Sequence, residues 1–159
     1  MMIQLLLKEH YPQVSKIYAQ GLITGIATFE TEVPTWKQWD KKFLKKCRFV
    51  ALIGTEVLAW CALNKVSNRA VYRGVAEDTI YVAPQHRGKG IGKLLLKYLV
   101  SESEKEGFWS LQAAIFPENE ASIQLHLNCG FRIVGRREKI AQRGGKWFDN
   151  KLLERRTSI

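Results

Sequence analysis

The residues best suited to chemistry form a basic, glycine-rich stretch in the middle of the chain. Residues 87–92 read Arg-Gly-Lys-Gly-Ile-Gly, between a run of strand-forming residues and a run with helical periodicity. Glycines let a ligand approach the backbone closely, and the free N–H groups at a helix start bind anions. The pattern is neither a GxGxxG fingerprint nor a P-loop. It predicts a site for a phosphate-bearing ligand; the alternative is a turn whose glycines only allow close packing.

Two adjacent acids, Glu77 and Asp78, interrupt the apolar run that precedes this stretch. Side chains alternate along a strand, so the two carboxylates should face opposite sides of the sheet. Acids are depleted in strands, and local departures of this kind often mark functional sites. A carboxylate can take a proton from a substrate ammonium group. We predict this role for Glu77, whereas a structural or substrate-adjacent role is the better interpretation of Asp78.

Composition limits the class of protein. The chain has 159 residues, 46% hydrophobic content and a net formal charge of +10. These values predict one globular domain, residues 1–159, and exclude a disordered or fibrous chain. Three widely spaced cysteines and the lack of a long apolar run predict a cytoplasmic protein without a metal site, disulfide framework or membrane segment. The basic excess, concentrated in residues 132–156, fits a solvated face, a phosphorylated small molecule or nucleic acid.

Hydrophobic patterns predict a mixed sheet with helices. The expected strands are residues 3–7, 49–53, 57–63, 75–82, 111–116, 131–140 and 147–154. The expected helices are residues 12–20, 35–46, 91–106 and 119–128. The strand–helix–strand unit over residues 75–116 should make two strands parallel, and the other strands should be antiparallel partners.

Turn and capping residues set the expected boundaries. Gly21 should follow the end of the first helix, and residues 35–38 form a capping box that opens the second. Residues 54–56 predict a three-residue hairpin loop, whereas residues 144–145, both glycine, predict a loop rather than a tight turn.

Several segments together resemble one known family. The glycine-rich stretch matches the Gln/Arg-x-x-Gly-x-Gly/Ala signature of the GCN5-related N-acetyltransferases. Further segments resemble the phosphinothricin and methionine sulfone acetyltransferase branch, over about residues 2–155 in order and spacing. These segments are residues 27–31, 72–77, 80–84, 119–122, 126–131 and 145–149.

The resemblance implies an α/β fold of the acetyltransferase type, in a single domain with a seven-stranded, mostly antiparallel sheet, a central parallel strand pair and four helices. It implies acetyl-CoA as acetyl donor, direct transfer to a primary amine and no metal. The residues that it assigns to the cofactor are Tyr81, Val82, Ala83, Arg87, Gly88, Lys89, Gly90, Ile91, Gly92, Lys93 and Asn119. The first three border the thioester carbonyl, the next seven hold the pyrophosphate, and Asn119 contacts the pantetheine arm.

The same resemblance implies roles in catalysis and substrate selection. Glu77 occupies the position of the general base, and His126 stands where many relatives have a tyrosine that protonates the departing thiolate. The acceptor contacts that it implies are Phe29, Glu30, Tyr72 and Arg73. The expected acceptor is a small amino acid analogue of the phosphinothricin, methionine sulfoximine or methionine sulfone type.

Other functions remain open at this point. The acceptor can be another amine, such as an antibiotic, a polyamine or a peptide N-terminus. A basic nucleic-acid-binding protein and an inactive acetyl-CoA sensor are alternatives from other classes. No recognised nucleic-acid motif is present, and nucleic acid would leave the glycine-rich stretch unexplained. The branch often forms dimers, so a homodimer is expected.

Overall fold

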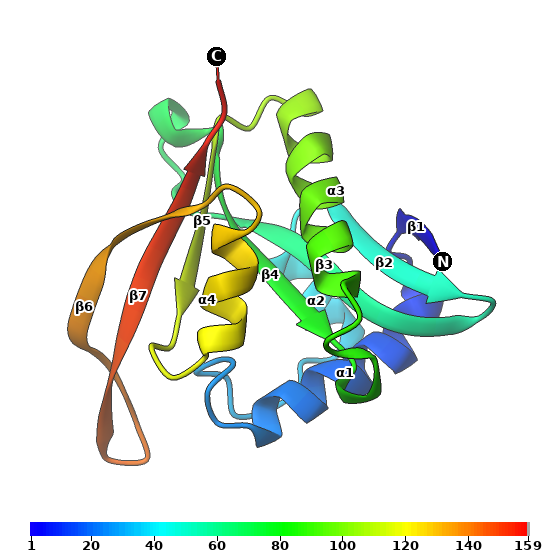
Figure 1. The fold of residues 1–159 in the computed structure, drawn as a ribbon, viewed down its shortest axis with the longest axis horizontal. Coiled ribbons are helices and arrows are strands. Elements are labelled where there is room, and N and C mark those ends of the chain that lie inside the picture. Colours follow the sequence, from blue (N-terminus) through cyan, green and yellow to red (C-terminus); the bar gives the residue numbers. More distant parts are fainter. Residues whose placement is uncertain (159) are drawn as a thin grey trace.

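The computed structural model describes residues 1–158 as a seven-stranded sheet with helices on both faces (Figure 1). The strands are β1 (Met2–Leu5), β2 (Arg48–Ile53), β3 (Glu56–Lys65), β4 (Val75–Val82), β5 (Ser110–Ile115), β6 (Arg132–Arg143) and β7 (Lys146–Arg156). The helices are α1 (Tyr11–Ile23), α2 (Trp36–Lys42), α3 (Ile91–Lys105) and α4 (Glu120–Leu127). Among residues 1–158, no helix combines the length and apolar composition needed to cross a membrane.

The strand order is β1-β2-β3-β4-β5-β7-β6, and only β4 and β5 are parallel neighbours. This confirms the predicted mixed sheet with a central parallel pair. The two strands pair over three positions, Val75 to Glu77 on β4, and then diverge, as Figure 1 shows. Beyond Glu77, β4 keeps its antiparallel partner β3 as far as Val82, and β5 keeps β7. The facing edges of β4 and β5 therefore form an open wedge.

The two faces of the sheet bury separate apolar clusters. On one face, α1 and α2 pack Val14, Ile17 and Trp39 against β2, β3 and β4. On the other, α3 packs Leu95 and Leu99 against the same strands and β5. Because side chains alternate along β4, even-numbered residues face α3 and α4, whereas odd-numbered residues face α1 and α2.

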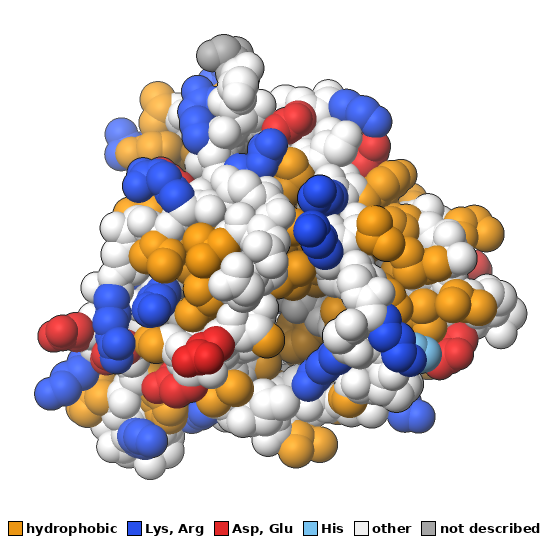
Figure 2. Space-filling model, in the orientation of Figure 1, with side chains coloured by type: hydrophobic (Ala, Val, Ile, Leu, Met, Phe, Trp, Pro, Cys, Tyr) orange, Lys and Arg blue, Asp and Glu red, His pale blue; other side chains and the backbone are white. Residues whose placement is uncertain are grey.

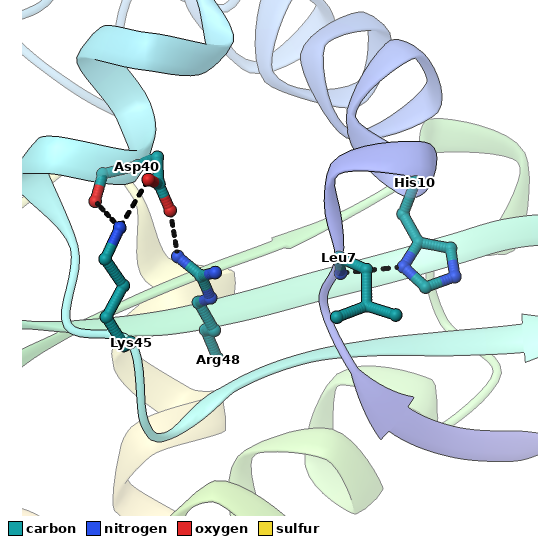
Figure 3. Close-up of polar contacts among 5 residues, drawn as sticks. All are labelled: Leu7, His10, Asp40, Lys45 and Arg48. Carbon is teal, nitrogen blue, oxygen red and sulfur yellow. Dashed lines mark hydrogen bonds and ion pairs between the residues drawn. The ribbon is translucent and has the colours of Figure 1, made fainter.

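Polar contacts hold the helices of the first face to the sheet (Figure 3). Asp40 of α2 accepts a hydrogen bond from Arg48 of β2, Nη1 to Oδ1, at 2.6 Å, and also pairs with Lys45. The hydrogen bonds from Lys45 and Arg48 lower the pKa of the Asp40 carboxyl below its usual value. Near the start of α1, the Leu7 N–H donates to His10 Nδ1 at 2.9 Å.

Two helix boundaries differ from the sequence-based prediction. α1 continues through Gly21 to Ile23 instead of ending before this glycine. Gly21 is needed for space: a Cβ there would lie 2.4 Å from Cε1 of Tyr81. The capping box at Thr35 is confirmed, but α2 ends at Lys42, and the extended Phe43 starts the crossing to β2.

Both predicted hairpin loops are in fact two-residue turns. Ile53 pairs with Glu56, which leaves only residues 54 and 55 between β2 and β3. Arg143 pairs with Lys146, so Gly144 and Gly145 alone join β6 and β7. Both of these glycines have positive φ angles, 57° and 76°. Positive φ at both central residues is the geometry that matches the twist of two antiparallel strands.

Candidate active site

A cavity of about 780 Å³ opens at the wedge between β4 and β5. Its lining comes from both strands, from the first residues of α3, from the length of α4, and from Thr24 and residues 26–30 of the connection between α1 and α2. We call that connection, residues 24–35, the α1–α2 loop. Figure 2 shows the hollow between α4 and the start of α3, with Lys and Arg side chains at its rim. The positive rim suits an anionic ligand.

The start of α3 presents open backbone to the cavity. Gly88 and Gly90 have φ angles of 73° and 79°, and a Cβ on either would meet no atom within 4 Å. The N–H of Leu94 makes the first helical bond, to Gly90 O at 3.1 Å, so the preceding N–H groups lack helical partners. Gly92 is different, because its Cβ would lie 3.3 Å from Val82 Cγ2. The first two glycines leave room for a ligand, and the third permits close packing of α3 on β4.

Most residues predicted to bind the cofactor line this cavity. Those that do are Tyr81, Val82, Arg87, Gly88, Gly90, Ile91, Gly92, Lys93 and Asn119. Ala83 and Lys89 do not line it. The side chain of Asn119 caps α4, since Oδ1 accepts from Ser122 N–H at 3.3 Å, and its Nδ2 donates to Ile26 O at 3.4 Å.

The hydrogen bonds of β4 show which backbone groups face the wedge. The N–H of Ala83 donates to Leu58 O on the β3 side at 2.8 Å. In an antiparallel pair, alternate residues exchange bonds with the partner strand. The N–H groups of Val82 and Ile80 therefore point to the open edge. Val82 O also points away from β3, because it accepts from Arg87 Nε at 3.2 Å. Of the three consecutive residues predicted to border the thioester, Val82 has its N–H in the wedge.

Glu77 lies on the opposite face from Asp78, at the last position where β4 and β5 pair. Gln112 stands beside it on β5 and donates from Nε2 to Glu77 Oε2 at 3.0 Å. Within residues 1–158, no side chain is hydrogen-bonded to the other carboxylate oxygen, Oε1. Glu77 is half-buried and lines the cavity. Gln112 orients one oxygen and leaves the other available to take a proton. The sequence did not reveal Gln112, because strand register was unknown.

The α1–α2 loop forms the cavity wall on the Glu77 side of the sheet. Phe29 and Glu30 both line the cavity, and Glu30 pairs with Lys42 at 3.4 Å. Tyr18 and Tyr81 stand edge to face with ring centroids 5.1 Å apart. Burial, and to a lesser degree the proximity of Tyr18, raises the pKa of Tyr81 well above its usual value. Burial raises the pKa of Tyr18 as well. Both phenols stay neutral near pH 7, and Glu77 and Glu30 contribute the carboxylates that line this side of the cavity.

Tyr72 and Arg73, the other predicted acceptor contacts, do not line the cavity. Tyr72 is exposed, with the Arg69 guanidinium 5.5 Å from its ring centroid. The guanidinium of Arg73 lies 5.3 Å from the ring centroid of Trp109. Its Nη1 donates to Ala70 O at 3.4 Å. The structure therefore brings Phe29 and Glu30 together with Glu77, but not Tyr72 or Arg73.

Asp78 and His126 form a buried pair on the α4 side of the wedge. His126 Nε2 lies 2.8 Å from Asp78 Oδ2, and Nδ1 lies 2.7 Å from Ser122 O. Only 2% of His126 is exposed. Burial lowers the pKa of the imidazole, but the charge and hydrogen bond of Asp78, together with the Ser122 carbonyl, outweigh it and raise the pKa above 6.5. Asp78 thus has a partner that the sequence did not identify. The available signal was an acid within an apolar strand.

The three cysteines offer no activated thiol. Cys47, Cys61 and Cys129 are buried, and burial raises the pKa of each thiol. For Cys47 the pKa reaches about 11. A thiol of raised pKa is a poor nucleophile, since the thiolate is the reacting form. None of the three cysteines therefore lies in surroundings that favour a thiolate nucleophile.

A helix start with N–H groups free of helical partners, an open parallel wedge and a carboxylate beside that wedge together fit an acyltransferase with a phosphate-bearing acyl donor. The model of the acetyltransferase (GNAT) family matches residues 13–131. The chain belongs to this family and is an N-acetyltransferase.

Relatives with assigned names support the same class. The chain is 29% identical over 157 residues to phosphinothricin N-acetyltransferase of Alcaligenes faecalis, covering 92% of this chain and 78% of that protein. It is 36% identical over 99 residues to the L-methionine sulfoximine/L-methionine sulfone acetyltransferase of Pseudomonas paraeruginosa, covering 62% of this chain and 58% of that one. The crystal structure of a phosphinothricin acetyltransferase from Sinorhizobium meliloti in complex with AcCoA is similar with a TM-score of 0.87 at 29% identity, over 98% and 87% of the two chains.

Proposed function

We propose that the enzyme transfers acetyl from acetyl-CoA directly to the primary amine of a small amino acid analogue of the phosphinothricin, methionine sulfoximine or methionine sulfone type. The observation that carries the proposal is the placement of Glu77. Its carboxylate borders a cavity that also contains the glycine-rich start of α3. A phosphate-bearing donor and an amine fit on opposite sides of the same wedge.

The donor is held mainly by backbone groups in this proposal. The N–H groups of residues 91–93 and the positive end of the α3 dipole attract the pyrophosphate, and Arg87 and Lys93 add full charges. The pantetheine arm follows the unpaired edge of β4. The thioester oxygen, which gains negative charge in the transition state, accepts from the N–H of Val82.

Glu77 acts as the general base. An ammonium acceptor must lose a proton before its nitrogen lone pair attacks the thioester carbon. The attack forms the C–N bond and then breaks the C–S bond, and the acetylated amine and CoA thiol are the products. The proton passes from nitrogen to Glu77 directly or through one water. Gln112 fixes the carboxylate, and the proton later passes to solvent.

His126 is the proposed source of the proton that the departing thiolate takes up. With both ring nitrogens beside acceptor oxygens, the imidazole is held in its protonated form. Delivery of that proton requires the ring to release one of its two contacts, or requires Asp78 to pass the proton on. This role is separable from that of Glu77, because the two groups lie on opposite faces of the sheet.

The decisive experiment is a thiol-release assay with acetyl-CoA and a panel of amines. Phosphinothricin, methionine sulfoximine and methionine sulfone should give the highest kcat/KM. The comparison set is ordinary amino acids, polyamines, aminoglycosides and peptides with a free N-terminus. A higher kcat/KM for a member of the comparison set would reject the proposed substrate class while leaving the acetyltransferase activity in place. The net charge of +10 disfavours polyamines by repulsion.

Nucleic acid is the alternative partner suggested by charge alone. Several phosphate contacts would give an affinity that falls steeply with salt, and gel-shift titrations at two salt concentrations would detect this. We expect no such binding.

We also propose a cytoplasmic homodimer, in line with the branch that the sequence resembles. Large apolar side chains exposed on β6 and β7 support an interface there, namely those of Ile133, Val134, Ile140 and Trp147. Light scattering would measure the mass of the particle in solution and so test the dimer.

A further inference from the structure

The α1–α2 loop forms the acceptor wall yet has little backbone support of its own. Thr24 and Gly25 continue the end of α1 through backbone bonds to Gly21 O and Leu22 O. From residue 26 to residue 34, no backbone-to-backbone hydrogen bond is present within the described chain. Thr24 and Thr28 hydroxyls accept only local bonds, from the N–H groups two residues later. Something else must hold this wall in place.

Arg143, at the tip of the β6–β7 hairpin, supplies that support. Its Nη1 donates to Thr28 O at 2.8 Å, and its Nη2 donates to Gly25 O at 2.6 Å. These bonds join residues 115 and 118 positions apart in the sequence. One planar guanidinium therefore fixes two carbonyls, three residues apart, within the loop segment that lines the cavity. Within residues 1–158, the other polar side-chain contacts that reach this loop from outside include the 3.4 Å bond from Asn119 to Ile26 O and the 3.4 Å ion pair between Lys42 and Glu30. At the end of the loop, the Tyr11 hydroxyl donates to Pro34 O.

An aromatic cluster fixes the guanidinium itself. Arg143 lies 4.8 Å from the ring centroid of Phe148 and 5.8 Å from that of Phe116. Phe29 of the loop packs against both rings, at 4.5 Å from Phe116 and 5.9 Å from Phe148. Phe29 and Phe116 also line the cavity. The Arg143 guanidinium is thus held behind the α1–α2 loop. Its two hydrogen bonds and the aromatic contacts together set the position of the Phe29 ring.

We propose that Arg143 is a positioning residue for the acceptor: it clamps the α1–α2 loop to the β6–β7 hairpin and so sets the shape of the acceptor pocket. The effect on acceptor binding rests on the proposed function, whereas the contact between the loop and the hairpin does not depend on it. The hairpin tip, far in sequence from Glu77, is then a determinant of acceptor selectivity. The hydrogen bonds and ring contacts of Arg143 go to Gly25, Thr28, Phe116 and Phe148, so the glycine-rich start of α3 should not respond to its loss.

The test compares Arg143→Met with Arg143→Lys and with the control Arg136→Met. Arg136 lies on the same strand and pairs through its guanidinium with Asp149 at 2.6 Å, away from the loop. Hydrogen exchange is measured peptide by peptide, and steady-state kinetics are measured with methionine sulfone and with phosphinothricin. Lysine keeps the charge but has one donor group in place of a planar fork, so it should restore only part of the function.

For Arg143→Met we expect faster exchange confined to residues 24–30, at the hydrogen-bonded N–H groups of Thr24, Gly25, Ile26 and Glu30. We also expect a KM for the acceptor raised at least about tenfold, in line with the loss of charge-assisted hydrogen bonds, with the KM for acetyl-CoA within about twofold. Unchanged exchange at residues 24–30, or faster exchange spread over the whole chain, would overturn the clamp. Faster local exchange with an unchanged acceptor KM would overturn its role in acceptor positioning. If the parent enzyme acetylates neither compound, the proposed substrate class fails, and the exchange experiment still decides on the clamp.

Discussion

The two sides of the cavity are built by different means. The donor side consists of regular elements: the start of α3, the unpaired edge of β4 and the cap of α4. The acceptor side consists of an irregular loop held by side chains from elsewhere in the chain, chiefly Arg143. The donor side therefore uses backbone groups whose positions follow from the fold. The acceptor side uses side chains, whose contacts can change while the fold stays the same.

This difference explains how one fold can keep one donor and change acceptors. The groups that serve the donor side are mainly backbone N–H groups, whose positions do not depend on the identity of one side chain. Substitution in the α1–α2 loop or at the hairpin tip alters a wall that the sheet does not need. Glu77 and Gln112 stand at the boundary, where β4 and β5 separate, and in the proposed mechanism they serve every acceptor in the same way.

The largest expected effect separates chemistry from donor binding. Glu77→Gln keeps the shape of the side chain and removes its basicity, so turnover at neutral pH should fall by about 10²–10⁴-fold. Acetyl-CoA affinity, measured by calorimetry, should stay within a few fold. The deficit should shrink as pH rises, because more of the acceptor amine is then unprotonated. The matched control is Glu30→Gln, an acid on the loop wall that we expect to affect KM more than turnover.

A Glu77→Gln enzyme that keeps more than about a tenth of the parental turnover would contradict this assignment, given the usual contribution of a positioned base. Asp78 would not then become the base by default. Its Oδ2 is bound to His126, and its side chain faces the other side of the sheet.

The second effect concerns the buried pair behind the donor side. His126→Gln leaves Asp78 buried without its cationic partner, which should lower the free energy of unfolding by about 3–5 kcal/mol. The pKa of His126 is raised on folding, so the stabilisation is complete below the unfolded value of 6.5 and is lost as pH rises through the folded value. Urea unfolding at about pH 6 and about pH 9 should thus show a larger gap between parent and variant at the lower pH.

The same His126 variant tests the leaving-group role. The maximal rate should fall while acetyl-CoA affinity changes little, and Asp78→Asn should reproduce part of this loss. A parental rate across the whole pH range would assign the pair to structure alone.

The third effect concerns the affinity of the donor side for acetyl-CoA. Gly90→Asp places a negative charge where the pyrophosphate approaches, and acetyl-CoA affinity should fall at least about tenfold, or about 1.4 kcal/mol. Gly90→Asn is the control, because asparagine tolerates the positive φ of 79° at this position but adds no charge. A similar loss in both variants would attribute the effect to shape rather than charge.

The smallest expected effect tests whether the acceptor pocket extends as far as Arg73. Arg73 rests on Trp109 outside the cavity, so Arg73→Ala should change the acceptor KM by no more than about twofold, as for most surface substitutions. A KM increase as large as that of Arg143→Met would show that Arg73 swings into the pocket when the acceptor binds.

The sequence predicted the regular elements better than the contacts between them. Strand and helix periodicity, the capping box at Thr35 and the glycine-rich stretch are local patterns, and each is confirmed in the fold. Gly21 was misread as a helix end because its true constraint, the ring of Tyr81, lies 60 positions away in the chain. The partners of Asp78, Glu77 and the α1–α2 loop likewise depend on register and tertiary contacts that no local pattern encodes.

The short parallel pairing also has a consequence for how the chain opens. Within residues 1–158, three register pairs and the bonds from the N–H groups of Trp109 and Ser110 to Gly74 O connect the backbone of β1–β4 to that of β5–β7. Each of these two groups of strands is internally joined by longer antiparallel ladders. Proteins open in cooperative units of differing stability, and this junction is a natural boundary between two such units. A donor molecule lying along both edges of the wedge would bridge the boundary, so its binding should make the two units unfold as one.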